Sequence, residues 1–180
     1  MKFVVTGGAG FIGSHIAKHL VNHNHSVTVV DNLSRGRLEN LSKIEEQIEF
    51  KKIDILDFNA LKEIISNSDG IFHQAALTSV PESFTQKEKY HDVNVKGTEN
   101  IFKLSKEFGK KVVYASSSSI YGNTTTIPIQ ENFEKNPINP YGITKLDDEK
   151  LAKKYHDLGL SVIGLRYFNV YGIGQTNDYA

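Results

Sequence analysis

The chain has 180 residues, none of which is cysteine and only one of which is methionine. Without cysteine it forms no disulfide, and it offers neither a thiolate nucleophile nor a cysteine ligand for zinc. The same absence is compatible with a reducing compartment. A cytoplasmic location is therefore expected, with chemistry that relies on other side chains.

Net charge and long apolar runs are also lacking. Lys plus Arg and Asp plus Glu number 21 each, so no net field would hold the chain on nucleic acid or on an anionic membrane. No apolar run approaches the roughly 18 residues needed to cross a bilayer. Glycines interrupt the apolar start of the chain, which argues against a signal peptide. Neither nucleic acid nor membrane is expected as a partner.

Short β-branched runs alternate with longer amphipathic stretches, as in a parallel sheet with crossover helices. With 39% hydrophobic residues, a chain of this length is expected to form one compact domain. Strands are predicted at 2–6, 26–31, 48–54, 70–74, 111–116 and 160–166, and helices at 11–23, 57–66, 89–108 and 141–158. Right-handed crossovers would place the helices on both faces. The predicted class is α/β, a doubly wound parallel sheet.

Two segments interrupt this alternation. Residues 122–139 are polar and contain Pro128 and Pro137, and connections of this length in compact domains usually serve a site. Residues 166–180 follow the last predicted strand without any closing element.

The stretch VVTGGAGFIGS places glycines in two overlapping spacings. Gly8, Gly10 and Gly13 read as G-x-G-x-x-G, whereas Gly7, Gly10 and Gly13 read as G-x-x-G-x-x-G. They follow an apolar strand and open an amphipathic helix, where glycine permits a tight turn, close approach of a pyrophosphate and close packing of helix on sheet. Free N–H groups and the positive end of the helix dipole would meet the phosphates. The pattern predicts a dinucleotide site.

Asp31, at the end of the second predicted strand, indicates which dinucleotide is bound. A carboxylate there accepts hydrogen bonds from both hydroxyls of an adenosine ribose and repels a 2′-phosphate, which favours NAD over NADP. Arg35 is the alternative signal, since an arginine in that position could reach a 2′-phosphate.

The stretch NPYGITK places Tyr141 and Lys145 four residues apart on the last predicted helix. Asn139 can cap that helix and Pro140 suits its first position. Side chains four apart lie on the same face, and a nearby ammonium favours the ionised form of a phenol. The spacing alone fits an exposed amphipathic pair equally well.

Six motifs in order resemble the extended short-chain dehydrogenase/reductase family and, within it, the nucleotide-sugar epimerases of the UDP-glucose 4-epimerase type. The resemblance extends over essentially the whole chain. The motifs are TGGAGFIGS, DN at 31–32, HQAA at 73–76, VYASSSSIYG at 113–122, YGITK at 141–145 and RYFNVYG at 166–172.

The resemblance implies three catalytic residues. Tyr141 would be the acid/base, and Lys145 would bond the nicotinamide ribose and favour the ionised phenol. The family's catalytic hydroxyl stands four residues before the tyrosine of YG, which makes it Ser117 before Tyr121. From the residues alone, the serines at 116–119 cannot be told apart, because a serine run after a strand is ordinarily a polar loop.

The resemblance also implies the residues that would bind NAD and a nucleotide sugar. Asn94 would lie below the nicotinamide half of NAD, although a helical asparagine bonded to nearby backbone is the ordinary alternative. Asn169 would contact the diphosphate of the sugar nucleotide, and Ser79 would be a weaker contact from the substrate-side loop. The other cofactor positions are Gly7, Gly10, Phe11, Ile12, Gly13, Asp31, Asn32, Asp54, Ile55, Ala75, Ala76, Tyr141 and Lys145.

The choice of reaction depends on the residues after Ser117. Family members that dehydrate or decarboxylate nucleotide sugars usually carry Asp or Glu there, whereas positions 118 and 119 are serine in this chain. The resemblance therefore implies epimerisation at C4 of a UDP-hexose through a 4-keto intermediate, with NAD carrying the hydride. A dehydratase or decarboxylase, or an NAD-binding module without turnover, remains the alternative.

His15, His19 and His23 recur at four-residue spacing, but no acidic residue lies among them, and a solvated helix face is the expected reading. No metal site is predicted. Members of the family normally continue for more than a hundred residues into a smaller substrate domain. Residues 1–180 are thus expected to be an NAD-binding domain with catalytic residues, lacking that substrate domain and impaired in turnover. In the family, the helices matching 89–108 and 141–158 form a dimer contact.

Overall fold

A computed structural model describes residues 1–175 and contains one sheet of six parallel strands. Their order across the sheet is β3-β2-β1-β4-β5-β6. The strands are β1 (Lys2–Thr6), β2 (Ser26–Val30), β3 (Ile48–Lys51), β4 (Gly70–His73), β5 (Lys111–Ser117) and β6 (Val162–Tyr167). This is the Rossmann order, and the predicted α/β doubly wound class is confirmed.

The crossover helices are α1 (Phe11–Asn22), α2 (Phe58–Ser66), α5 (Gly97–Glu107) and α6 (Pro140–Asp157). Two short helices, α3 (Val80–Thr85) and α4 (Lys87–Tyr90), precede α5. The prediction of one helix over 89–108 was wrong in detail, because a π-helical turn over His91–Lys96 separates α4 from α5. Such turns widen a helix locally and often occur at functional sites.

The helix α3 was not predicted, although its signal is in the sequence. Ser79 caps it by accepting a hydrogen bond from the backbone N–H of Glu82, with the N–O distance 3.4 Å. Ser79-Val80-Pro81-Glu82 has the S-x-x-E spacing of a capping box. A proline close to the helix start fits the same reading.

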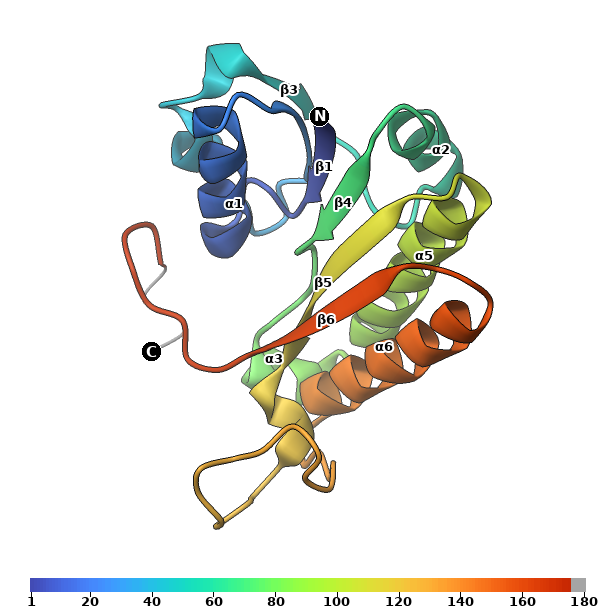
Figure 1. Cartoon of the computed structure of the whole chain (residues 1–180). Helices are drawn as coiled ribbons and strands as arrows, with labels where there is room; N and C mark the ends of the chain where they lie inside the picture. Colours follow the sequence, from blue (N-terminus) through green and yellow to red (C-terminus); the bar gives the residue numbers. More distant parts are fainter. Residues whose placement is uncertain (176–180) are drawn as a thin grey trace.

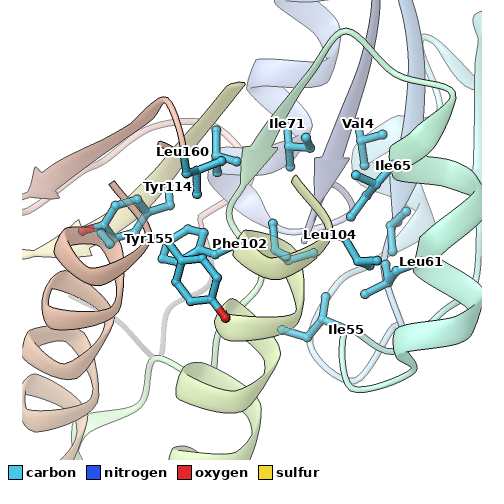
Figure 2. Packing of buried hydrophobic residues seen from close by; sticks show 14 residues of the cluster. Val4, Ile55, Leu61, Ile65, Ile71, Phe102, Leu104, Tyr114, Tyr155 and Leu160 are labelled. Atoms are coloured by element: carbon cyan, nitrogen blue, oxygen red, sulfur yellow. The ribbon is translucent and has the colours of Figure 1, made fainter. Parts of the chain in front are cut away.

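The helices form two layers, one on each face of the sheet (Figure 1). The helix α1 packs on β1 and β2, and the apolar cluster on this side includes Val5, Ala17 and Val29. On the opposite face α2, α5 and α6 enclose the larger cluster, in which Phe102 and Tyr114 meet edge to face (Figure 2). The central strands are buried on both sides, which explains their almost uninterrupted apolar sequences.

The start of α6 is specified locally. The Asn139 side chain accepts a hydrogen bond from the Gly142 backbone N–H at 2.7 Å, and Pro140 occupies the first turn. Both features follow the prediction, and the helix begins at Pro140. Tyr141 and Lys145 therefore project from the first two turns of a capped helix beside the end of β5.

Strand order reverses between β1 and β4, so the crevice for a ligand lies at the carboxyl ends of these strands. The strand β3 ends at Lys51 rather than at the predicted 54, where the Asp31 backbone N–H donates the last bond to the Lys51 carbonyl. Within residues 1–175, no helix is both long and apolar enough to cross a bilayer.

Candidate functional site

A cleft of about 1060 Å³ lies along the carboxyl ends of the strands. Its wall extends from Asp31 at the end of β2, past the glycine loop, to Ser117 at the end of β5 and to the segment after β6. Three inter-strand spacings separate β2 from β5, which corresponds to roughly 14 Å. The cleft is therefore long enough for an extended dinucleotide rather than for a single small molecule.

The glycine loop forms the floor of this cleft between β1 and α1. Each position requires glycine for a different steric reason. Gly7 has a φ of +66°, and a Cβ there would lie 2.6 Å from the Ala75 backbone nitrogen. A Cβ on Gly13 would overlap the Gly7 carbonyl, whereas one on Gly10 would meet only the Gly7 oxygen, at 3.1 Å. Gly7 thus makes the turn, Gly13 lets α1 pack on it, and Gly10 leaves space beside the cleft.

The two possible glycine spacings are now distinguished. Gly7, Gly10 and Gly13 line the cleft, whereas Gly8 is absent from its lining and is packed against Val29. The spacing whose glycines line the cleft is G-x-x-G-x-x-G. Gly10 precedes the first residue of α1, so the N-terminal end of the helix dipole faces the cleft.

Asp31 closes the end of the cleft at β2. The residue is 8% exposed, and its carboxylate accepts hydrogen bonds from the Ala9 and Leu33 backbone N–H groups, at 3.0 and 2.8 Å. Burial raises the pKa of Asp31, and the two backbone hydrogen bonds oppose that rise. Each oxygen keeps lone-pair capacity for a ligand hydroxyl.

Arg35 lines the same end of the cleft but forms an ion pair with Glu82 of α3. This hydrogen-bonded arginine lowers the pKa of Glu82. The contact joins the loop after β2 to the segment after β4. Because the Arg35 guanidinium is paired with the Glu82 carboxylate, Arg35 is a weaker indication of NADP binding through a 2′-phosphate.

The four serines at 116–119 differ in their position and hydrogen bonds. Ser116 and Ser117 line the cleft, whereas Ser118 and Ser119 are absent from its lining. The Ser116 hydroxyl donates to Glu149 at 2.8 Å, and the Ser117 hydroxyl accepts from the Ser119 backbone N–H at 3.1 Å. The Ser117 proton is therefore the one available to a ligand.

Tyr141 and Lys145 line the cleft opposite the end of β5. The Lys145 ammonium is almost wholly buried and donates to the Ala115 carbonyl and to Asp148, each at 3.1 Å. Burial alone would lower the pKa of Lys145, but the charge of Asp148, then Tyr141, outweighs burial and raises it. A permanent cation thus stands beside the tyrosine.

His73, at the end of β4, is buried below the cleft between two threonine hydroxyls. Its Nδ1 lies 2.6 Å from the Thr6 hydroxyl and its Nε2 lies 2.9 Å from that of Thr98. Burial, aided by the charge of Lys145, lowers the pKa of His73 to about 3. The imidazole is therefore neutral and acts as a bridge between β1, β4 and α5.

All but three of the residues predicted for the site line the cleft. Those that do are Gly7, Gly10, Phe11, Ile12, Gly13, Asp31, Asn32, Ile55, Ala75, Ala76, Ser117, Tyr141, Lys145 and Asn169. Asp54, Asn94 and Ser79 are absent from the lining, and each supports a neighbour instead.

At these three positions the structure shows hydrogen bonds to neighbouring residues, and the predicted ligand contacts stay predictions. Asp54 accepts a hydrogen bond from Asn32 at 2.8 Å. Ser79 uses its hydroxyl to cap α3. Asn94 is fully buried in the π-helical turn, where it bonds both backbone groups of Leu77 and the Thr144 hydroxyl. The ordinary alternative for Asn94, bonding to nearby backbone, is the one observed.

Several lining residues were not predicted. Gln74 and Thr78 follow β4, Tyr167 ends β6 and Phe168 follows it, and Asn40 lies in the short helical turn Leu38–Leu41 after β2. The rule that ligands bind at the carboxyl ends of parallel strands would have indicated the residues after β4 and β6. Nothing in the sequence indicates Asn40, which bonds the Ala9 carbonyl.

The three histidines on α1 and at its C-terminal cap do not converge. His15 bonds the Ile173 carbonyl at 2.8 Å, while the rings of His19 and His23 lie 4.2 Å apart. In the part of the chain that the structure describes, no group of three or more potential metal ligands comes together.

Comparisons with known proteins agree with this geometry. The model of the NAD dependent epimerase/dehydratase family matches residues 3–179. The UDP-glucose 4-epimerase of Bacillus subtilis is 38% identical over 96% of this chain and 53% of its own length.

Two solved structures are similar in fold and sequence. A UDP-N-acetylglucosamine 4-epimerase from Methanobrevibacter ruminantium, in complex with UDP-N-acetylmuramic acid, has a TM-score of 0.93, 39% identity and coverage of 97% of this chain and 57% of its own. A dTDP-glucose 4,6-dehydratase from Streptomyces venezuelae, with NAD bound, has a TM-score of 0.93, 31% identity and coverage of 97% and 58%. This chain spans little more than half the length of each.

Proposed function

Because the chain belongs to the NAD dependent epimerase/dehydratase family, we propose that it binds NAD and carries the catalytic residues for epimerising a nucleotide sugar at C4. One observation carries the proposal. Ser117, Tyr141 and Lys145 line one end of a cleft whose other end is closed by the buried carboxylate of Asp31. The ends are far enough apart for the two halves of a dinucleotide.

The residues of the cleft suit NAD. Gly10 leaves backbone space where the pyrophosphate would lie against the start of α1. Asp31 and Asn32 would hold the adenosine ribose, and Lys145 the nicotinamide ribose. When bound, NAD supplies a reversible hydride acceptor beside the sugar.

The chain's own residues would handle the proton. We assign Tyr141 as the base that takes the proton of the C4 hydroxyl and later returns it, with the buried Lys145 ammonium stabilising the phenolate. The Ser117 hydroxyl, whose proton has no acceptor among residues 1–175, would bridge the sugar oxygen and Tyr141. Asn169 would contact the diphosphate from the segment after β6.

The side chains near Tyr141 favour epimerisation over dehydration or decarboxylation. Among residues 1–175, the only carboxylate lining the cleft is Asp31, which lies at the opposite end. Dehydration requires an additional acid/base group beside the sugar. The cleft provides Ser116 and Ser117 there, with a hydroxyl and no carboxylate.

The activity is tested with UDP-glucose and UDP-galactose in the presence of NAD. The assay follows interconversion for the 180-residue chain and for a longer form that reaches the length of its relatives. Calorimetry with NAD and NADP is run in parallel. Interconversion by the longer form is expected, with tighter binding of NAD than of NADP. NAD binding without interconversion in either form would contradict the epimerase activity and favour an NAD-binding module without turnover.

We also propose a homodimer through α5 and α6, the helices that match the family's dimer contact, and a cytoplasmic location. The two helices pack together, and Ile143 is 48% exposed on α6. Sedimentation over a range of concentrations tests the dimer. A monomer at all concentrations, in both the short and the longer form, would contradict it.

A further inference from the structure

Lys145 has a buried ionic partner to which the proposed function gives no role. The Asp148 carboxylate lies three residues further along α6, with its Oδ2 3.1 Å from the Lys145 Nζ. The side chains of Lys145 and Asp148 are 4% and 0% exposed. The pair lies on the inner face of α6, between the cleft and the core.

The neighbouring acid on the same helix shows how different this position is. Asp147 forms an ion pair with Lys150, whose side chain is 68% exposed. Such a surface pair contributes little. Asp148 instead points inward, and its only hydrogen-bonded cation among residues 1–175 is Lys145.

Stability of the fold does not explain a buried aspartate here. Removing two charges from water costs more than their attraction commonly returns. Burial raises the pKa of Asp148 to about 6, against the opposing charge of Lys145. Its Oδ1 is buried and makes no hydrogen bond of ordinary geometry in the described part of the chain, although the Thr98 side chain lies close enough to help lower the pKa of Asp148. A carboxylate kept ionised at neutral pH at this cost needs a role beyond packing.

The hydrogen bonds of Lys145 indicate that role. An ammonium has three N–H bonds, and two of them go to the Ala115 carbonyl and Asp148. These acceptors hold the Nζ at the cleft wall, where Tyr141 also lies. Among residues 1–175 no acceptor takes the third N–H bond, which is therefore left for a group in the cleft.

We propose that Asp148 is a positioning residue of the site: its carboxylate holds the Lys145 ammonium at the cleft wall beside Tyr141 and keeps it charged. The role of Lys145 itself rests on the proposed function. The pairing of Lys145 with Asp148 does not depend on it.

The other titratable groups around the pair do not substitute for Asp148. On β4, His73 is held neutral by burial. On β5, burial raises the pKa of Tyr114, and the charges of Glu149 and Asp148 raise it further, so this phenol is neutral as well. On α6, Glu149 is committed to Arg166, with Oε1 2.7 Å from Nε.

The test is a titration of Lys145 followed by NMR in protein with isotope-labelled lysine side chains, with the Lys145 signal assigned by Lys145→Arg. In the natural sequence Lys145 is expected to titrate above the ordinary lysine value of about 10.4. In Asp148→Asn the titration is expected to move down by at least about one pKa unit. Asp147→Asn is the matched control and is expected to leave it unchanged.

Two outcomes would overturn the proposal. One is a Lys145 that titrates at or below the ordinary value in the natural sequence, which needs no variant to fold. The other is an unchanged Lys145 titration in folded Asp148→Asn. If Asp148→Asn does not fold, Asp148→Ser, which makes room for a water molecule, serves in its place with the same expected shift.

The measurement is independent of turnover. A chain that fails to interconvert UDP-glucose and UDP-galactose but shows the shift would contradict the proposed function and keep the role of Asp148. An active longer form in which Asp148→Asn leaves the Lys145 titration unchanged would keep the proposed function and contradict the role of Asp148.

Discussion

At the scale of single residues, the glycine loop separates packing from ligand binding. Gly10 and Gly13 belong to the same motif, yet an added Cβ would have different effects. At Gly13 it would overlap the Gly7 carbonyl, and at Gly10 it would meet only the Gly7 oxygen, at 3.1 Å. The two positions therefore distinguish a fold requirement from a binding requirement.

Gly13→Ala is expected to lower the free energy of unfolding by about 1–3 kcal/mol, the usual cost of overpacking. Gly10→Ala is expected to change it much less and to weaken NAD binding, because its Cβ would enter the space proposed for the pyrophosphate. Urea unfolding and calorimetry with NAD measure the two effects. Equal losses of stability in the two variants would contradict this division.

Tyr141→Phe is expected to reduce turnover of the longer form by at least about a hundred-fold, the usual contribution of a general acid/base. NAD affinity should stay within a few-fold, because the ring that lines the cleft is retained. Normal turnover in this variant would remove Tyr141 from its role.

Ser117→Ala is expected to lower kcat of the longer form, since its hydroxyl is the one left free for the sugar oxygen. Ser116→Ala is the matched variant, because the Ser116 hydroxyl already donates to Glu149. Steady-state kinetics of both variants make the comparison. A larger loss of kcat in Ser116→Ala than in Ser117→Ala would show that Ser116, and not Ser117, supplies the hydroxyl.

At the scale of elements, α6 determines where Tyr141 and Lys145 stand. Its start was predicted from Asn139 and Pro140 and is observed there. Its other anchor was not predicted. Arg166 of β6 forms two hydrogen bonds with Glu149 of α6 and one with the Tyr121 hydroxyl. These contacts join residues far apart in sequence, so no local pattern indicates them.

Asn139→Ala is expected to lower the free energy of unfolding by about 1 kcal/mol through loss of the cap. Asn139→Ser, which retains an acceptor oxygen, should restore most of it. Thermal or urea unfolding of the two variants measures the difference. No change in Asn139→Ala would show that tertiary contacts alone fix the start of α6.

At the scale of the whole molecule, buried titratable groups connect stability to pH. His73 has a pKa of about 3 in the folded state and an ordinary value near 6.5 when unfolded. Between these values the unfolded chain binds more protons. The stability contributed by neutral His73 is therefore present above about pH 6.5 and is lost as the pH falls.

Asp148 acts in the opposite direction. Its pKa of about 6 in the folded state exceeds the ordinary value of 3.8, so the folded state binds more protons between these values. Its contribution to stability is present below the lower value and is lost as the pH rises through about 6. It partly masks the effect of His73 in mildly acidic solution.

His73→Gln is therefore expected to lose less stability than the natural sequence between about pH 7 and pH 4.5, even if it is less stable throughout. Urea unfolding at several pH values measures the slope. His156→Gln, which replaces an exposed histidine, is the control and should leave the slope unchanged. A slope unaffected by His73→Gln would show that other groups govern the acid response.

The sequence by itself determined the class of fold, the order of its elements and many of the residues that line one cleft. Apolar runs alternating with amphipathic stretches are enough to indicate a parallel sheet, since burial on both faces requires them. Glycine spacing, the acid after β2 and the Tyr141 and Lys145 pair are local patterns, and each of them marks a residue that lines the cleft.

Only the tertiary structure decided what each side chain is free to do. It showed that Gly7 lines the cleft whereas Gly8 packs against Val29, and that the Ser116 hydroxyl donates to Glu149 whereas that of Ser117 does not. It also placed Asn94 in the interior, outside the cleft lining. It also placed Asp148 beneath Lys145, whereas Asp147, its neighbour in sequence, lies outside. Hydrogen-bond partners and burial depend on groups brought together from distant parts of the chain, and those are what determine whether a hydroxyl, an amide or a carboxylate can act on a ligand.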